Sequence, residues 1–276
     1  MTKPFRVDLS GNPRGRLVVL LHGWPDDGHL WDELVGGLDG DYRFARVTLP
    51  AFDGSNEDGE DFSTWVVRLH ATIANLKPEN KIVLIAHDWG AWLAYLYERE
   101  HSPEIAAMVT MDVGGHAAPS GLGHTLFVLG YQWWLVAAYF VGHAVPVVGN
   151  GMSRAIARMA RAPRASQTSY RMNYPYFYFW RAMFNPRYEK SLLKGYEPRV
   201  PVLYLYGKKK PYHFHSAKWE AILRKDNRSA IVEMAGSGHW IMRDEFLETK
   251  RAIEKWLSSL GLSKQPRGTE RGPELA

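Results

Sequence analysis

The sequence contains no cysteine among its 276 residues. Disulfide bridges, thiolate metal sites and a cysteine nucleophile are therefore excluded, and the composition fits a reducing compartment. The residues from Met1 to Arg6 include no apolar stretch of the kind found in a secretory signal. From these two absences we expect a cytoplasmic protein.

Charged residues are missing from one long internal stretch. No Asp, Glu, Lys or Arg occurs from Val113 to Ser153, and residues 125–148 are nearly apolar. A run of this kind can indicate a membrane span, but Gln132, His143 and Pro146 interrupt this one. We expect a lid that lines an apolar pocket, with peripheral membrane contact as the alternative.

The remaining composition is that of an ordinary globular chain, with 46% hydrophobic and 23% charged residues. The net charge of +5 is dispersed, since only Lys208–Lys210 forms a tight basic run. No nucleic-acid-binding motif accompanies that run, so we expect a solvated surface and no nucleic-acid partner. No His or acidic pair has metal-ligand spacing on one element, so we expect no metal or other cofactor. The sequence indicates no partner protein or oligomeric state.

Short apolar runs alternate with helical patterns along much of the chain. Runs this short and this apolar are typical of strands buried on both faces, and their alternation with helices predicts an α/β fold with a mostly parallel sheet. Helices are expected at Ser63–Leu76, with Ser63 as the N-cap, at Ala91–Arg99 and at Phe246–Leu260. The predicted strands are Leu17–Leu21, Phe44–Leu49, Lys81–Ala86, Ile105–Met111, Val202–Tyr206 and Ala230–Met234.

The alternation stops between Gly114 and Pro198, where aromatic residues, glycine and proline are frequent and the spacing is helical. We therefore expect a core built from residues 1–114 and 199–262, with residues 115–198 inserted as a helical cap or lid. Residues 263–276 are polar and are expected to form a disordered tail.

The strongest chemical signal is the segment 85–91, Ile-Ala-His-Asp-Trp-Gly-Ala, between a predicted strand and a predicted helix. Small residues permit a sharp turn that raises one side chain above the carboxyl end of the sheet, the nucleophile elbow of hydrolases. That side chain is Asp88 where a serine is usual. A carboxylate is ionised at neutral pH and can attack an sp³ carbon directly, forming an ester with the enzyme. The rival interpretation of Asp88 is a residue that merely begins the helix.

Two further loops complete this constellation. His239, in the segment 236–240 after the last predicted strand, is expected to act as the general base that activates water against the ester. The backbone N–H groups of Trp24 and Trp89 are expected to form the oxyanion hole. His22 and His87 are expected to be structural, while Asp26 and Asp27 are expected to cap a helix near Gly28, with contact to the site as the alternative.

The acid that orients His239 is less obvious. The loop after the strand Val202–Tyr206, its usual place, reads Gly-Lys-Lys-Lys and has no carboxylate, and Asp226 is too far along. Asp112 follows the preceding strand, and we predict that it is the acid.

These motifs resemble those of the epoxide hydrolase and haloalkane dehalogenase group of the α/β-hydrolase superfamily. The likeness is carried by residues 22–25 (His-Gly-Trp-Pro), 87–90 (His-Asp-Trp-Gly) and 238–239 (Gly-His), and it extends from Leu17 to about Leu260. It implies an α/β-hydrolase fold with an inserted helical cap, and an acid placed at Asp112 has precedent in the group.

The resemblance favours an epoxide hydrolase acting on a small lipophilic substrate, because an aromatic residue and proline follow His-Gly. Such enzymes use two lid tyrosines as proton donors to the oxirane oxygen. Tyr131 and Tyr178 are our candidates, with Tyr174 and Tyr176 close by, although Trp180 stands where the second tyrosine is common. The substrate is expected to contact Trp24, Trp89, Trp133, Tyr174 and Trp240.

Two alternatives remain open. A haloalkane dehalogenase would use the same nucleophile, but commonly has Asn at the position of Trp24. A non-catalytic ligand-binding protein on the same fold is suggested by the missing acid after Tyr206 and the irregular lid tyrosines.

Overall fold

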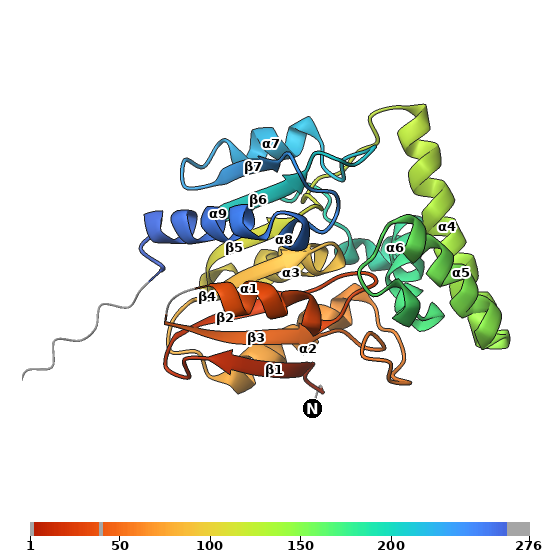
Figure 1. Cartoon of the computed structure of the whole chain (residues 1–276), viewed down its shortest axis with the longest axis horizontal. Coiled ribbons are helices and arrows are strands. Elements are labelled where there is room, and N and C mark those ends of the chain that lie inside the picture. Colours follow the sequence, from red (N-terminus) through yellow and green to blue (C-terminus); the bar gives the residue numbers. More distant parts are fainter. Residues whose placement is uncertain (1–2, 39–40, 264–276) are drawn as a thin grey trace, which may run out of the picture.

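The computed structural model describes residues 3–38 and 41–263, and its centre is a seven-stranded sheet flanked by helices (Figure 1). β1 pairs with β3 in antiparallel fashion, and the other neighbouring strands are parallel. The predicted α/β class with a mostly parallel sheet is confirmed. In spatial order the strands are β1 (Arg6–Gly11), β3 (Tyr42–Thr48), β2 (Arg16–Leu21), β4 (Ile82–His87), β5 (Ile105–Met111), β6 (Val202–Gly207) and β7 (Ala230–Met234).

Six of these strands coincide with the predicted apolar runs, but β1 was not predicted. Its residues are exposed or half-buried because it lies at the edge of the sheet. An edge strand needs no continuous apolar run, so the sequence carries only a weak signal for it.

The connections place the helices on both faces of the sheet. The chain steps from β2 to β3 in one direction and from β3 to β4 in the other, so right-handed crossovers put α1 and α2 on opposite faces. α3 packs against α2, and α9 packs against α1. The bounds are α1 (Asp32–Gly37), α2 (Phe62–Leu76), α3 (Trp89–His101), α7 (Ala217–Leu223), α8 (Ile241–Asp244) and α9 (Phe246–Ser259), with 3-10 turns η1 (Gly28–Trp31) and η2 (Ser102–Glu104).

The reversal of direction between the β2–β3 and β3–β4 connections determines where a binding site can form. β2 lies between β3 and β4, so the loops that leave the carboxyl ends of β2 and β4 diverge to opposite faces and open a crevice. The motif at residues 22–25 follows β2, and the motif at residues 87–90 follows β4.

The predicted start of α2 needs one correction. Its N-cap is Asp61, whose carboxylate accepts a hydrogen bond from the backbone N–H of Thr64 at 2.9 Å. Ser63 lies inside the first turn, because a carboxylate two residues earlier already satisfies the free N–H groups there.

The segment between β5 and β6 carries helices and, within the described residues, no strand of the sheet, as the sequence predicts. We call residues 115–198 the insertion. It lies beyond the carboxyl ends of the parallel strands, at the right of Figure 1. Its elements are α4 (Leu122–Ala144), α5 (Pro146–Met159), η3 (Ala165–Gln167), η4 (Tyr170–Asn173), α6 (Tyr174–Phe184) and η5 (Pro186–Ser191).

Buried polar bonds hold the insertion on the core. The indole N–H of Trp24 donates to Asn173 Oδ1 at 2.9 Å, and the Asn173 amide donates to Ser153 Oγ at 2.8 Å. Arg181 pairs with Asp61 at 3.0 Å. These contacts fix α6 above the carboxyl ends of β2 and β4.

Within the described part of the chain, α4 alone is long and apolar enough to cross a bilayer. Most of this helix is not buried within the protein. Apart from its first residue, the predicted tail at 263–276 lies outside the described residues.

Candidate active site

Asp88 lies at the tip of the turn between β4 and α3. Its φ of 54° is in a region that costs a non-glycine residue energy. A Cβ on Gly90 would lie 2.2 Å from the Leu21 carbonyl oxygen, and one on Gly23 would lie 2.3 Å from Asp88 Oδ1. The two glycines therefore allow the elbow and the loop after β2 to touch. Asp88 makes no side-chain capping bond to α3, so its carboxylate is not a helix cap.

The Asp88 carboxylate is held by backbone donors. The N–H of Trp24 donates to Oδ1 at 2.7 Å, and the N–H of Trp89 lies close enough to lower the pKa of the carboxylate. Burial raises the pKa of Asp88 above its ordinary value, although these donors and His239 oppose the shift. The side chain is 14% exposed, so a water-sized molecule can reach it. The two predicted oxyanion-hole residues thus meet at one carboxylate.

His239 faces Asp88 from the loop after β7. Its Nε2 lies 3.7 Å from Asp88 Oδ2, and its Nδ1 donates to Asp112 Oδ2. His87 donates from Nε2 to the His239 carbonyl at 2.9 Å, which orients the loop. Burial alone would lower the pKa of His239, but the charges of Asp112 and Asp88 outweigh it and raise the pKa.

Asp112 is fully buried at the end of β5, where the structure brings it against His239. Its second oxygen forms an ion pair with Lys210, whose side chain is also buried. Burial would raise the pKa of Asp112, but Lys210 and His239 hold it well below its usual range. Lys210 thus occupies the loop where this fold usually carries the acid itself. The expectation that the run Lys208–Lys210 is all solvated surface is wrong for Lys210.

His22 and His87 have the structural roles that we predicted. Leu49 N–H donates to His22 Nε2 at 3.0 Å, so Nδ1 carries the proton and donates to the Gly23 carbonyl. Burial lowers the pKa of His22 to about 4 and that of His87 to about 3. Both rings are therefore neutral at neutral pH.

The adjacent acids Asp26 and Asp27 do two different things. Asp27 caps η1 by accepting from the His29 N–H at 2.9 Å, as predicted. Asp26 instead points toward the site and accepts from the Trp240 indole at 2.7 Å. Burial raises the pKa of Asp26 to about 6. Trp240 packs edge-on against the His239 ring at 4.7 Å between centroids.

Aromatic rings close the site opposite Asp88. Tyr176 from α6 lies edge-on to Trp89 and Trp24, at centroid distances of 5.2 and 5.9 Å. Tyr131 from α4 lies edge-on to Tyr176 at 6.0 Å, and its hydroxyl accepts from the Gln132 amide at 3.2 Å. Burial raises the pKa of both tyrosines, and the charge of Asp88 adds to the shift. The two phenols are therefore neutral at neutral pH, and both lie close enough to Asp88 for its charge to raise their pKa.

Three predicted site residues lie elsewhere. The Tyr178 hydroxyl donates to the Gly59 carbonyl at 3.1 Å, on the side of α6 away from Asp88. Tyr174 is fully buried between Phe52 and Trp65. Trp133 stacks on Trp180 at the outer surface. Of the three tyrosines of α6, Tyr176 is the one that packs on Trp24 and Trp89 beside Asp88.

A separate cluster of possible metal ligands lies near the amino ends of β4 and β5, whereas Asp88 follows the carboxyl end of β4. His70, His101 and Glu104 come from three different elements, so spacing along one element did not reveal them. The imidazole rings stack at 4.2 Å with planes 12° apart. A metal ion is bound in the plane of each imidazole that ligates it, and these two planes are nearly parallel and stacked, which is a poor geometry for a shared ion.

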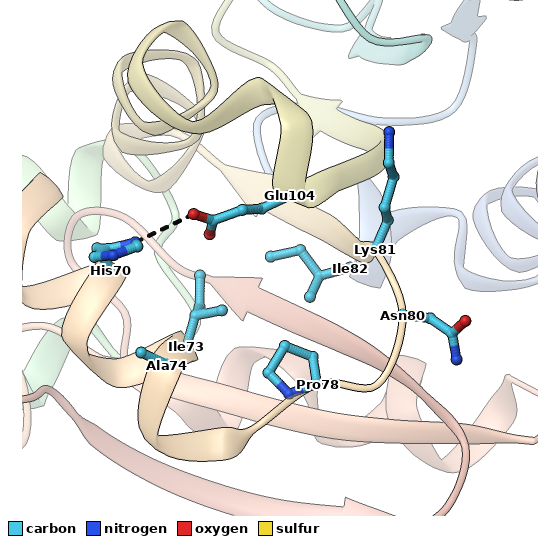
Figure 2. A pocket seen from close by; sticks show the side chains of 8 residues that line it. All are labelled: His70, Ile73, Ala74, Pro78, Asn80, Lys81, Ile82 and Glu104. Atoms are coloured by element: carbon cyan, nitrogen blue, oxygen red, sulfur yellow. Dashed lines mark ion pairs between the residues drawn. The ribbon is translucent and has the colours of Figure 1, made fainter.

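A cavity of about 300 Å³ lies beside that cluster (Figure 2). His70 and Glu104 point toward one another across its rim. Its lining includes Lys81 and Ile82 at the amino end of β4, whereas Asp88 follows the carboxyl end. The cavity is therefore not part of the Asp88 site.

The fold and the elbow geometry define an α/β-hydrolase, and the alpha/beta hydrolase family matches residues 18–249. The chain belongs to that family. Epoxide hydrolase 3 of Xenopus tropicalis is 29% identical over 112 residues, which cover 39% of this chain and 30% of that protein. A haloalkane dehalogenase of Mycolicibacterium smegmatis is 27% identical over 113 residues, which cover 39% of this chain and 36% of that protein. The chain thus spans about one third of the length of these curated relatives.

Solved structures show the same fold over nearly the whole chain. A thermophilic esterase from Thermogutta terrifontis superposes with a TM-score of 0.68 at 16% identity, covering 93% of each chain. At that identity the likeness concerns the fold alone.

Proposed function

We propose that this protein is an epoxide hydrolase that opens a lipophilic epoxide to a vicinal diol. The observation that carries the proposal is the placement of Tyr131 and Tyr176 around Asp88, which itself faces His239. A carboxylate nucleophile needs no proton donor of its own, whereas an opening oxirane does. Two neutral phenols beside the nucleophile meet that need.

The first step is the formation of an ester. Oδ1 of Asp88 accepts the N–H of Trp24, while Oδ2 faces His239, so Oδ2 is the oxygen that attacks an oxirane carbon. The carbon–oxygen bond of the ring breaks, and the leaving oxygen takes a proton from Tyr131 or Tyr176. The aromatic rings above Asp88 favour an apolar substrate.

The second step is hydrolysis of that ester. His239 Nε2 takes a proton from water, and the water oxygen attacks Cγ of Asp88. The N–H groups of Trp24 and Trp89 stabilise the negative charge that develops on Oδ1. The ester bond breaks, the departing alkoxide takes the proton from His239, and the acid proton left on Asp88 restores the tyrosine through solvent.

A single turnover in heavy-oxygen water, with enzyme in excess, tests this sequence of steps. The water oxygen enters the carboxylate, so we expect the label in the peptide that contains Asp88 and an unlabelled first diol. The peptide that contains Asp226 is the internal control and stays unlabelled. Label found only in the diol would mean that water attacks the epoxide directly.

One observation supports a dehalogenase as the second candidate. The indole N–H of Trp89 is buried beside the Tyr176 hydroxyl and makes no hydrogen bond of normal geometry among the described residues, so it can donate to a halide. The indole of Trp24 is not free, because it donates to Asn173. Halide release from a panel of short haloalkanes, with no turnover of epoxides, would favour this candidate. Ligand binding without turnover of epoxides, haloalkanes or esters would favour a non-catalytic protein.

Replacing Tyr176 with Phe separates the two enzyme candidates. An epoxide hydrolase would lose one of its proton donors, and we expect epoxide turnover to fall about 100-fold. Tyr178→Phe is the matched control, because Tyr178 sits two residues away and bonds to Gly59 instead. Its turnover is expected to stay within about twofold of the wild type, since no proton donor is lost. Equal losses in the two variants would contradict the role of Tyr176.

Lys210→Met is expected to shift the pH dependence of ester hydrolysis. His239 is surrounded by Asp88, Asp112, Asp26, His87 and Lys210. Removal of Lys210 takes away a positive charge and raises the pKa of His239. Since only the neutral ring activates water, the acid limb of the profile should move up by about one pH unit.

The control for this shift is Lys209→Met, which removes the same charge from the exposed neighbour. Its profile should overlay that of the wild type. A Lys210→Met protein with an unshifted acid limb would show that Lys210 does not act through Asp112 and His239.

A further inference from the structure

The outward face of α4 is an apolar stripe that the rest of the described chain leaves largely exposed, although Trp133 stacks on Trp180 and Phe140 contacts Phe177. Leu122, Leu126, Leu129, Trp133 and Phe140 recur at helical spacing and lie on one side of the helix. Leu122 is 75%, Leu126 60% and Phe140 54% exposed. The helix stands at the edge of the molecule, away from the sheet (Figure 1). Contiguous apolar surface of this extent marks an interaction site.

The charged residues along the segment 114–188, which includes α4 and α5, have one sign. Seven arginines and no Asp, Glu or Lys occur between Gly114 and Tyr188. Arg164, Arg171 and Arg181 pair with carboxylates of the core. Two other arginines, Arg158 and Arg161, are exposed, and no carboxylate of the described residues lies within ion-pair distance of either.

These two arginines lie on or just after α5, the helix that packs beside α4. α5 runs alongside α4, and the Trp134 indole donates to the Met152 carbonyl at 3.0 Å. Arg158 and Arg161 lie at and just beyond the carboxyl end of α5. The surface therefore combines an apolar stripe with free positive charge, which is the combination that binds anionic lipid.

α4 cannot cross the bilayer without dismantling the site. Its inner face, which includes Leu135, Val136 and Ala138, is buried in the protein, and the helix contacts both α5 and α6. α6 carries Tyr176, which packs on Trp89 beside the nucleophile. A spanning α4 would pull these contacts apart, whereas an α4 lying in the plane of the interface keeps them.

We propose that the α4 stripe is a docking surface for an anionic lipid bilayer, on which the helix lies flat. A second copy of the chain fits less well. A symmetric dimer through α4 would bring together two α4–α5 segments (residues 122–161) that carry arginines and no acids, and like charges would repel. Anionic headgroups complement the same charges. The inference does not depend on the reaction that Asp88 performs.

Vesicle flotation tests the proposal with the whole protein. We expect binding to vesicles of phosphatidylcholine and phosphatidylglycerol in a 70:30 ratio, weaker binding to phosphatidylcholine alone, and a loss at high salt because screening weakens the arginine contribution. A Leu122→Asp/Leu126→Asp variant should bind the anionic vesicles at least tenfold more weakly. Both substitutions lie in the first turns of α4, where added acids favour a helix.

The matched control is Val67→Asp/Leu247→Asp, which adds the same charge at exposed positions of α2 and α9. It should bind vesicles nearly as well as the wild type. A wild type that does not float with anionic vesicles, or equal losses in the two variants, overturns the proposal. A dimer seen by light scattering that the Leu122→Asp/Leu126→Asp variant abolishes would identify a second copy as the occupant.

Turnover of a water-soluble substrate keeps this test separate from the proposed reaction. The α4 variant leaves Asp88, His239 and both site tyrosines in place, so it should retain wild-type turnover. A wild-type protein that floats but is inactive would contradict the proposed hydrolase reaction and support the membrane surface. A wild-type protein that is active but never floats would support the reaction and contradict the membrane surface.

Discussion

Replacing His239 with Gln is expected to trap the protein as a covalent adduct. In the proposed cycle Asp88 attacks without help, but water must be deprotonated before it can open the ester. The Gln variant should still alkylate Asp88, since the nucleophile keeps the N–H of Trp24 and of Trp89. Hydrolysis should slow by about 1,000-fold or more. Intact mass spectrometry after incubation with substrate should show a gain equal to the substrate mass.

The control for this experiment is His87→Gln. His87 is buried, neutral and bonded to the His239 carbonyl, so it supports the loop without touching the ester. That variant should be less active but should not accumulate adduct, because His239 remains as base. A His239→Gln protein that turns over substrate at its unmodified mass would remove His239 from the mechanism.

Asp88→Asn is expected to abolish turnover while preserving the fold. A neutral amide is a poor nucleophile toward carbon, so we expect a loss of about 10,000-fold or more. The pKa of Asp88 is raised by burial, so its ionised form weakens the folded state at neutral pH. That penalty is present above the folded pKa and vanishes as the pH falls. At neutral pH the variant should therefore unfold at the same temperature as the wild type or higher.

Thermal unfolding and turnover measured on the same samples check both parts. Asp226→Asn is a control for loss of a carboxylate, because Asp226 pairs with Arg228 at the surface. It should keep its activity. A folded Asp88→Asn protein with substantial turnover would mean that another group is the nucleophile.

The local motifs of this protein could be predicted from the sequence because steric constraints fix the residue types in short segments. The elbow needs small residues around Asp88, and Gly23 and Gly90 are required where backbones touch. Parallel buried strands need apolar runs, so six of the strands could be located from sequence. Since the carboxyl ends of such strands meet at one edge, the loops that carry Asp88, Trp24 and His239 could also be predicted to converge.

The choice among the lid tyrosines could not be made in the same way. Tyr174, Tyr176 and Tyr178 stand two residues apart, and two residues rotate a helix by about 200°. Tyr174 and Tyr178 therefore share the side of α6 near Gly59, while Tyr176 faces Asp88. The neighbouring residues of α6 are nearly all apolar or aromatic, so no polar face revealed which side is buried against the site.

The α/β class, the sharp turn at Asp88 and the loops that carry Trp24, Trp89 and His239 could be located from the sequence alone, because each depends on backbone geometry over a few residues. The packing of the folded chain, by contrast, pairs Lys210 with Asp112, turns Tyr176 toward Asp88 and leaves Trp133 at the outer surface. These outcomes depend on the rotation of helices and on contacts between distant segments. Lys210 and Asp112 are separated in the sequence by the whole insertion and by β6, so no local pattern indicates that they pair.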